Sequence, residues 1–125
     1  RYLALPVVGA LLIAGPMLGP YHASKFALEA MTDTLRIELA LWGIGVAAIE
    51  PGQIATPIWA TASAKADTMI DGMPPEAMEL YAKGIAGARA SAKRAAAEGL
   101  PPDRVADAII NALTAARPKT RYLVG

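Results

Sequence analysis

The chain has 125 residues but no cysteine and only one histidine, His22. Without cysteine it can form neither a disulfide nor a thiolate metal site, and a single imidazole cannot make a metal cluster. We therefore expect no metal site. The lack of disulfides is compatible with a reducing compartment, and we expect a cytoplasmic protein. We interpret His22 as a positional residue.

Charge is also scarce, because charged residues make up 18% of the chain and 12 basic residues face 11 acidic ones. A net charge of +1 gives no electrostatic reason to bind nucleic acid or an anionic membrane. A hydrophobic fraction of 54% in one domain's length predicts a chain that is largely buried. These values favour small-molecule chemistry.

Residues 1–20 contain no Ser or Thr and are nearly all apolar, so a signal peptide or a membrane span has to be considered. Helix breakers interrupt the segment throughout, namely Pro6, Gly9, Gly15, Pro16, Gly19 and Pro20. We favour a short buried strand within Leu3–Ile13 and a loop over Ala14–Pro20. A membrane segment in residues 1–20 is the minor alternative.

Tyr21 and Lys25 are the most informative side chains, because they lie four positions apart. In a helix such a pair lies on one face with Cβ atoms about 5–6 Å apart. A nearby cation favours the phenolate form of a tyrosine, which suits it for proton transfer. Taken alone, the spacing is also compatible with a surface lysine beside a half-buried tyrosine.

A long helix is predicted over Ala23–Trp42 and is stopped by Gly43. Apolar side chains follow helical spacing and charged ones occupy another face; the apolar set is Leu28, Met31, Leu35, Leu39 and Trp42, and the charged set is Glu29, Asp33 and Arg36. Such a helix is long enough to cross a sheet and to present a stripe to a partner.

A strand is predicted over Ile44–Glu50, where small and β-branched residues end abruptly at Pro51-Gly52. In open parallel sheets, ligands bind just beyond the carboxyl ends of the strands. The segment placed there comprises Pro51, Gly52, Gln53, Ile54, Ala55 and Thr56. It is a candidate ligand-binding loop, with an ordinary connecting loop as the alternative.

Residues 57–99 are rich in Ala and Met and are interrupted by Pro74, Pro75, Gly84 and Gly87, which predicts short helices in a mobile lid. Its Met69, Met73, Met78 and Tyr81 either line an apolar substrate pocket or only pack, and Lys83, Arg89, Lys93 and Arg94 form a solvated face. A helix over Asp103–Ala116 and a strand over Arg121–Val124 complete an α/β order of elements.

Taken in this order, the chain resembles the carboxyl-terminal half of a short-chain dehydrogenase/reductase, in the branch with steroid and retinol dehydrogenases. The resemblance extends from about Pro16 to the end and rests on the run Tyr21–Ala30, the helix through Trp42-Gly43, and Glu50-Pro51-Gly52 followed by Thr56-Pro57. It implies residues 1–125 form the carboxyl-terminal part of a doubly wound parallel-sheet (Rossmann-type) domain, with residues 57–99 as its substrate lid.

The resemblance also implies NAD or NADP as cofactor, with Tyr21 exchanging a proton with the substrate while hydride moves to or from the nicotinamide. Lys25 would lower the pKa of the tyrosine and hold the nicotinamide ribose, and Ser24 would be structural. The remaining cofactor contacts would be Pro51, Gly52 and Ile54 beside the nicotinamide, Ile54 through its backbone, and Thr56 with the carboxamide or the phosphates.

The chain departs from the family in two respects. The family places a serine about a dozen residues before its tyrosine, where this chain has Val7, Val8 and Gly9. The glycine-rich first turn that binds the pyrophosphate is not among these residues. We therefore expect either a fragment of a longer protein or an inactive copy, with limited activity in isolation.

Three functions fit this sequence. The leading one is an oxidoreductase that interconverts a small apolar alcohol and its carbonyl. The second is a non-catalytic association module built on the helix over residues 23–42, which we expect to mediate homo-oligomers in either case. The third is a membrane-inserted segment in residues 1–20.

Overall fold

The computed structural model describes residues 2–6 and 17–125 of the chain. Two compact units are present: the first contains Arg1–Gly52 and Pro102–Gly125, and the second contains Gln53–Pro101. Each unit is described by itself.

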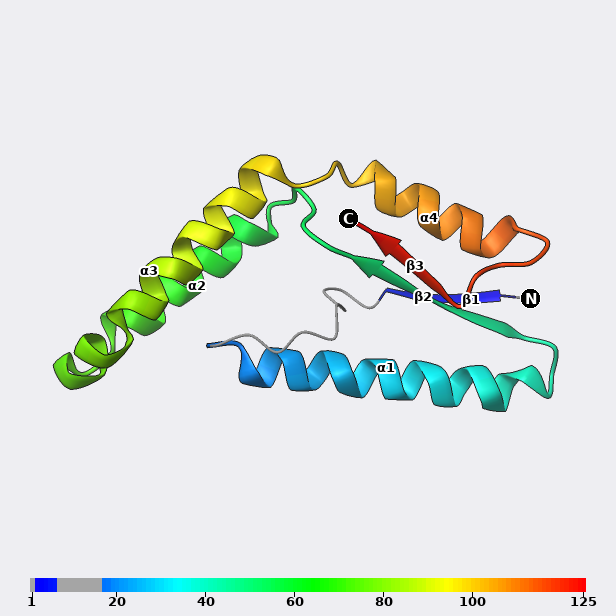
Figure 1. Cartoon of the computed structure of the whole chain (residues 1–125), viewed down its shortest axis with the longest axis horizontal. Helices are drawn as coiled ribbons and strands as arrows, with labels where there is room; N and C mark the ends of the chain where they lie inside the picture. Colours follow the sequence, from blue (N-terminus) through cyan, green and yellow to red (C-terminus); the bar gives the residue numbers. More distant parts are fainter. Residues whose placement is uncertain (1, 7–16) are drawn as a thin grey trace. The chain divides into compact units, whose positions relative to one another are not determined.

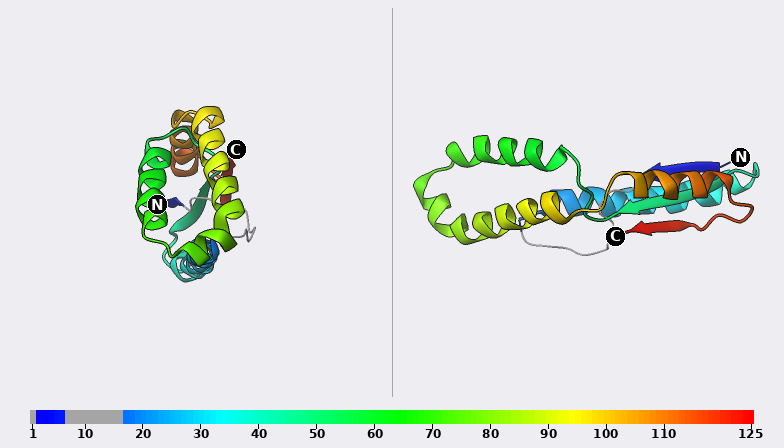
Figure 2. Two further views of the ribbon diagram at one scale, coloured as in Figure 1. Left: turned by 90° about the vertical axis from the view of Figure 1, so that its left-hand side faces the viewer. Right: turned by 90° about the horizontal axis from the view of Figure 1, so that it is seen from above.

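The first unit is a parallel three-stranded sheet with one helix on each face (Figures 1 and 2). Its strands are β1 (Tyr2–Pro6), β2 (Gly45–Pro51) and β3 (Arg121–Val124), in that order across the sheet. Helices α1 (Gly19–Ala40) and α4 (Asp103–Thr114) cover the two faces. The predicted α/β class is therefore confirmed.

Strand β2 is central and is buried along almost its whole length. Ala48 and Ile49 are completely buried, and Val46 and Ala47 are nearly so. A parallel strand covered on both faces reads as an apolar run without alternation, which is why this segment was recognisable in the sequence. Glu50 is the exception, because it carries a charge at 7% exposure.

The strand predicted within Leu3–Ile13 is present, but it is not buried where its side chains are described. Tyr2 and Leu3 are 40% and 39% exposed because β1 lies at the edge of the sheet. The rest of the expected strand and residues 14–16 of the expected loop over Ala14–Pro20 lie outside the described residues. Gly19 and Pro20 belong to α1 instead of the expected loop. Among the described residues, no helix is long and apolar enough to cross a membrane.

Helix α1 begins at Gly19, earlier than expected, so that Tyr21 lies inside the helix. Pro20 occupies the first turn, where its missing N–H costs nothing. The helix ends at Ala40, two residues before the predicted end at Trp42. Gly43 follows with a φ of 67°, which is unfavourable for residues with a Cβ. The N–H of Ile44 then donates to the carbonyl of Leu39 at 3.1 Å and closes the last turn.

The apolar residues predicted along this helix divide into partly buried and exposed ones. Leu28, Leu35 and Leu39 are partly buried, but Met31 and Trp42 are 60% and 70% exposed. The residues buried most deeply on α1 are instead Glu29 and Thr32. The Thr32 hydroxyl is satisfied within the helix, since it donates to the carbonyl of Leu28 at 2.8 Å. Glu29 needs a partner from outside the helix.

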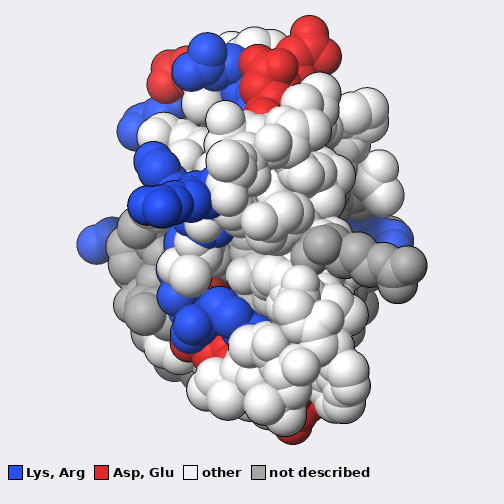
Figure 3. Space-filling view, turned by 90° about the vertical axis from the view of Figure 1, so that its right-hand side faces the viewer, with Lys and Arg blue, Asp and Glu red and all other residues white. Residues whose placement is uncertain are grey.

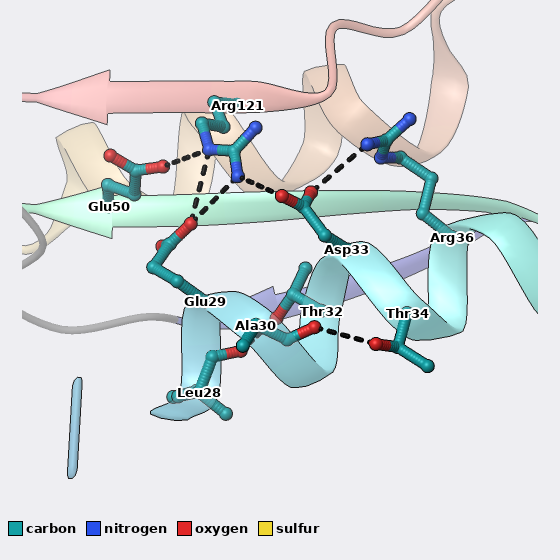
Figure 4. Close-up of polar contacts among 9 residues, drawn as sticks. All are labelled: Leu28, Glu29, Ala30, Thr32, Asp33, Thr34, Arg36, Glu50 and Arg121. Atoms are coloured by element: carbon teal, nitrogen blue, oxygen red, sulfur yellow. Dashed lines mark hydrogen bonds and ion pairs between the residues drawn. The ribbon is translucent and has the colours of Figure 1, made fainter. Parts of the chain in front are cut away.

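That partner is Arg121, the first residue of β3 (Figure 4). Its Nε and Nη2 donate to Oε2 of Glu29 at 3.2 and 2.9 Å, and Nη2 also donates to Oδ2 of Asp33 at 3.0 Å. Its Nε lies 3.4 Å from Oε1 of Glu50 on β2, an ion-pair distance without a hydrogen bond. One guanidinium thus joins α1, β2 and β3; we call these four residues the Arg121 cluster.

The pKa values of two carboxylates in the Arg121 cluster are shifted in opposite directions. Burial raises the pKa of Glu50, the negative charge of Glu29 raises it further, and Arg121 opposes the shift. Hydrogen bonds from Arg121 and Arg36 lower the pKa of Asp33, which is more exposed. Glu50 is therefore the carboxylate whose charge the fold disfavours.

The second unit is a helical hairpin made by α2 (Ile58–Asp71) and α3 (Pro75–Glu98), which lie side by side (Figure 1). A parallel bridge between Ile54 and Leu100 closes its open end, and the indole N–H of Trp59 donates to the Ile54 carbonyl at 2.7 Å. An exposed ion pair between Arg89 and Asp67 joins the two helices.

The sequence predicted several short helices here, and that expectation is wrong for α3. This helix runs for 24 residues straight through Gly84 and Gly87. A glycine inside a helix costs only about 1 kcal/mol, which packing can offset, whereas Pro75 fits the first turn and so marks a helix start. The predicted solvated face is confirmed, because Lys83, Arg89, Lys93 and Arg94 are all exposed.

Replacing Glu50 with glutamine should change how stability depends on pH. Because the pKa of folded Glu50 lies above the ordinary glutamate value of 4.5, the stability linked to its proton is lost as pH rises through the folded pKa. Glu50→Gln should therefore be as stable as the wild type at acid pH. Between the ordinary and the folded pKa, its free energy of unfolding should rise relative to the wild type by up to about 1.4 kcal/mol per pH unit.

The measurement is the free energy of urea unfolding at a series of pH values from about 4 to 8. Glu38→Gln removes a carboxylate from an exposed position of α1 in the same unit and serves as the control. If the difference between Glu50→Gln and wild type shrinks as pH rises, Glu50 has the opposite shift from the one described.

Two glycines of the second unit should respond oppositely to alanine. A Cβ at Gly99 would lie 2.6 Å from both the Ala55 nitrogen and the Ala95 oxygen, so Gly99→Ala should destabilise the unit by about 1–3 kcal/mol. A Cβ at Gly87 meets nothing within 4 Å, so Gly87→Ala should stabilise α3 by about 1 kcal/mol.

The two variants are compared by denaturant unfolding followed through Trp59 fluorescence, in a Trp42→Phe background that leaves one tryptophan. A Gly99→Ala variant as stable as its parent would show that the closure of the hairpin at Leu100 is looser than described.

Candidate functional site

Tyr21 and Lys25 lie together on the first two turns of α1, as the sequence predicted. The Lys25 ammonium nitrogen is over the Tyr21 ring, 5.3 Å from its centroid. This is within the range of a cation–π contact. Tyr21 is 40% exposed and Lys25 is partly buried, so both groups are accessible to a ligand.

Two neighbouring residues contact Tyr21. The His22 ring packs edge-on against the Tyr21 ring, with centroids 5.5 Å apart and planes at 75°. The Ser24 hydroxyl donates to the carbonyl of Tyr21 at 2.7 Å, a local bond within the helix. These contacts fit the positional and structural roles expected for the two residues.

Pro51 and Gly52 follow at the carboxyl end of β2, in the same unit as the pair. Pro51 is buried and Gly52 is exposed. The Gly52 N–H donates to the carbonyl of Val124 at 2.9 Å, so β3 fixes the first residue beyond the strand. The structure therefore gives this strand end a defined backbone rather than an unsupported loop.

Ile54 and Thr56 belong to the second unit. Ile54 is buried and its carbonyl already accepts the Trp59 indole N–H, so a ligand would meet its N–H instead. Thr56 is partly buried at the turn into α2, and its carbonyl accepts the Trp59 backbone N–H at 3.4 Å. The positions of both residues are therefore given only relative to other residues of the second unit.

The methionines and the tyrosine expected to line an apolar pocket are also in the second unit. Met69 and Tyr81 are 75% and 49% exposed, and Met73 and Met78 are partly buried. Their part in substrate binding stays a prediction.

The charge distribution offers no single strongly charged surface in the view of Figure 3. Lys and Arg side chains form separate groups on that face, some beside Asp and Glu, with larger uncharged areas between them. This matches the near balance of basic and acidic residues in the sequence.

Sequence reasoning missed the contribution of Glu29, Glu50 and Arg121. A glutamate at the end of a buried apolar strand is a signal that could have identified Glu50, because a buried carboxylate requires a partner. The residues near Glu50 in the sequence do not indicate which cation is that partner. Arg121 is 92 residues from Glu29 in the chain, so their contact depends on the fold.

Comparison with known proteins agrees with this arrangement. Residues 8–67, which contain Tyr21, Lys25 and the end of β2, match the family described as short chain dehydrogenase.

Similar curated proteins include the NADPH-dependent 3-dehydrocapnine reductase of Ornithobacterium rhinotracheale, 39% identical over 87% of this chain and 36% of the relative. Human 11-beta-hydroxysteroid dehydrogenase type 2 is 34% identical over 88% of this chain and 28% of the relative. Mouse retinol dehydrogenase 7 is 33% identical over 86% of this chain and 35% of the relative.

The chain thus spans between 28% and 36% of the length of these relatives. Its matching residues nevertheless include the tyrosine–lysine helix and the proline–glycine end of the buried strand, within a parallel α/β fold. Short-chain dehydrogenases use NAD or NADP, and one relative is named for NADPH. The chain belongs to the short-chain dehydrogenase family, with relatives in its retinol and hydroxysteroid branch.

Proposed function

We propose that the complete protein carrying these residues is an NAD(P)-dependent oxidoreductase that interconverts an alcohol and a carbonyl. The observation that supports this most strongly is the Lys25 ammonium over the Tyr21 ring, on a helix that packs against the strand ending in Pro51 and Gly52. A proton-transfer group and a candidate cofactor segment thus belong to one unit.

In this proposal the Tyr21 hydroxyl gives its proton to the carbonyl oxygen in reduction and takes it back in oxidation. The Lys25 ammonium stabilises the negative charge that develops on the phenol and hydrogen-bonds the nicotinamide ribose. The bound nicotinamide supplies or accepts the hydride. The exposure of Tyr21 and Lys25 fits this use, because a ligand can reach both.

The remaining cofactor contacts are proposed from the family pattern. Pro51 and Gly52 border the nicotinamide from the end of β2, where ligands of parallel sheets bind. The family pattern also assigns cofactor contacts to the Ile54 N–H and the Thr56 side chain, and the role of a substrate lid to residues 57–99.

The substrate is proposed to be a small apolar alcohol or its carbonyl. Two relatives are named for retinol and for an 11-beta-hydroxysteroid, both largely apolar. The exposed Met69 and Tyr81 of the proposed lid could cover such a molecule. No Ser or Thr precedes Tyr21 in residues 1–20, so the substrate oxygen depends more heavily on Tyr21 than in the family pattern.

We also propose that α1 mediates self-association through its outer side. Met31 lies on α1 and Trp42 lies two residues beyond its last residue, Ala40, and both side chains are exposed. Large apolar side chains exposed in this way are typical of interfaces. An association module without catalysis is the alternative function that this observation favours.

Replacing Tyr21 with phenylalanine should remove the proton donor but keep the ring over which Lys25 lies. Turnover in the complete protein should fall by about 10²- to 10⁴-fold, while the Kd for NAD(P)H stays within a few-fold. Lys25→Met should lower turnover and also weaken NAD(P)H binding, because Lys25 is proposed to contact the cofactor. Turnover is measured by the absorbance of reduced nicotinamide with a panel of apolar alcohols and aldehydes.

The matched control is Tyr122→Phe. Its hydroxyl accepts only a backbone hydrogen bond, from the Lys119 N–H at 3.0 Å, so its loss should cost about 1 kcal/mol of stability and leave turnover unchanged. Full turnover by Tyr21→Phe would exclude the proposed proton transfer. Failure of the wild type to bind NAD(P)H would exclude the oxidoreductase itself.

Charged substitutions on the outer side of α1 should dissociate the oligomer. Met31→Glu combined with Trp42→Glu places two carboxylates in the proposed apolar interface, and sedimentation velocity should show the monomer. Leu80→Glu, at a 79% exposed position of α3, is the control and should leave the mass unchanged. A wild type that is monomeric at micromolar concentration would exclude the association proposal.

A further inference from the structure

The Arg121 cluster connects the two places to which the proposed chemistry is assigned. On α1, Glu29 follows Lys25 by four residues and Tyr21 by eight, so the three lie along one side of the helix. At about 1.5 Å per residue, Glu29 is roughly 6 Å along the axis from Lys25. On β2, Glu50 directly precedes Pro51.

The backbone of β3 also holds the carboxyl end of β2. The Val124 carbonyl accepts the Gly52 N–H at 2.9 Å, and Glu50 and Pro51 lie opposite Leu123 and Val124 in the parallel ladder. The side chain of Arg121 therefore ties α1 to the same strand whose backbone fixes the end of β2. No other described ion pair connects α1 to the sheet.

The guanidinium is suited to this role by its shape and by its surroundings. It is planar and presents several N–H donors at fixed angles, whereas a lysine ammonium is a single point charge. It faces Glu29 and Asp33 from α1 and Glu50 from β2, while Arg36 binds Asp33 from the far side.

Without Arg121, two carboxylates would face each other unneutralised. The side chains of Glu29 and Glu50 are only 11% and 6% exposed, and one oxygen of each already lacks a hydrogen bond within the described part of the chain. Like charges in such surroundings repel strongly because water screens them little. The repulsion is relieved if Glu50 takes up a proton or if α1 moves away from β2, and at a pH where Glu50 stays ionised only the movement remains.

We infer that Arg121 is a positioning residue, whose one guanidinium sets the spacing between the helix bearing Tyr21 and Lys25 and the strand end bearing Pro51 and Gly52. The inference rests on the proposed function, since that spacing would place the tyrosine hydroxyl relative to the nicotinamide. Arg121 acts through Glu29 and Glu50 and touches neither substrate nor cofactor.

The kinetic test compares Arg121→Gln, Arg121→Lys and Arg36→Gln in the complete protein, well below the melting temperature of each. Arg121→Gln should lower kcat about 10- to 100-fold, because misplacement by about 1 Å is enough for such a loss. The KM for the cofactor should change far less. Arg121→Lys should recover part of kcat, since it keeps a cation between the carboxylates.

Arg36→Gln is the matched control because, within the described residues, the one ion pair of Arg36 is with Asp33, three residues away on its own helix, at 3.1 Å. It removes the same charge from the same region but breaks no link between elements, so kcat should stay within about twofold of wild type. Wild-type kcat in Arg121→Gln, or an equal loss in Arg36→Gln, would overturn the inference.

A second measurement is independent of activity. Spin labels at Ala30→Cys on α1 and Leu123→Cys on β3, both exposed positions, report the spacing by electron paramagnetic resonance, in a background without other cysteines. The distance distribution should be narrow in wild type and in Arg36→Gln, and broader or shifted in Arg121→Gln.

The two measurements separate the possible failures. If the wild type binds no NAD(P)H but Arg121→Gln broadens the distribution, the proposed function fails and the positioning role stands. If the distribution is unchanged in Arg121→Gln, the positioning role fails whatever the activity.

Discussion

The first unit depends on the neutralisation of Glu29 and Glu50 by Arg121 between α1, β2 and β3 (Figure 4). Removing a carboxylate from water costs several kcal/mol, which the fold recovers only if a cation lies within hydrogen-bonding distance. Arg121 meets that condition fully for Glu29, but only at ion-pair distance for Glu50. Burial raises the pKa of Glu50, the negative charge of Glu29 raises it further, and Arg121 opposes the shift. The strand end beyond Glu50 is consequently held by a contact that any movement of α1 would disturb.

The sequence was sufficient for the elements whose signals are local. The buried run ending at Pro51-Gly52, the strand Arg121–Val124 and the helix stopped by Gly43 were all predictable, because covered strands and helix terminators leave characteristic residues. The pairing of Tyr21 with Lys25 was predictable for the same reason, since helix geometry alone places them together. What failed needed information from distant parts of the chain.

The orientation of α1 is the clearest example of that limit. Apolar spacing placed Met31 and Trp42 in one set with three leucines that are partly buried, yet both are exposed and Glu29 is buried. A rule based on hydrophobicity alone places a glutamate in water, and only Arg121, 92 residues away, reverses that preference. The prediction that Gly84 and Gly87 interrupt the helix failed for a different reason. Packing of the hairpin outweighs a propensity cost of about 1 kcal/mol, so α3 continues through both glycines.

The proposed site therefore combines a rigid part with an adjustable one. The backbone positions are fixed by bonds from β3, through Arg121 to the helix and through Val124 to Gly52. The Lys25 side chain, by contrast, rests over the Tyr21 ring in a contact worth only about 0.5–1 kcal/mol at an exposed position. A ribose offering hydrogen bonds to that ammonium could displace it from the ring at little cost. The helix can thus present the tyrosine and the lysine together before a cofactor binds, and rearrange only one flexible side chain when it does.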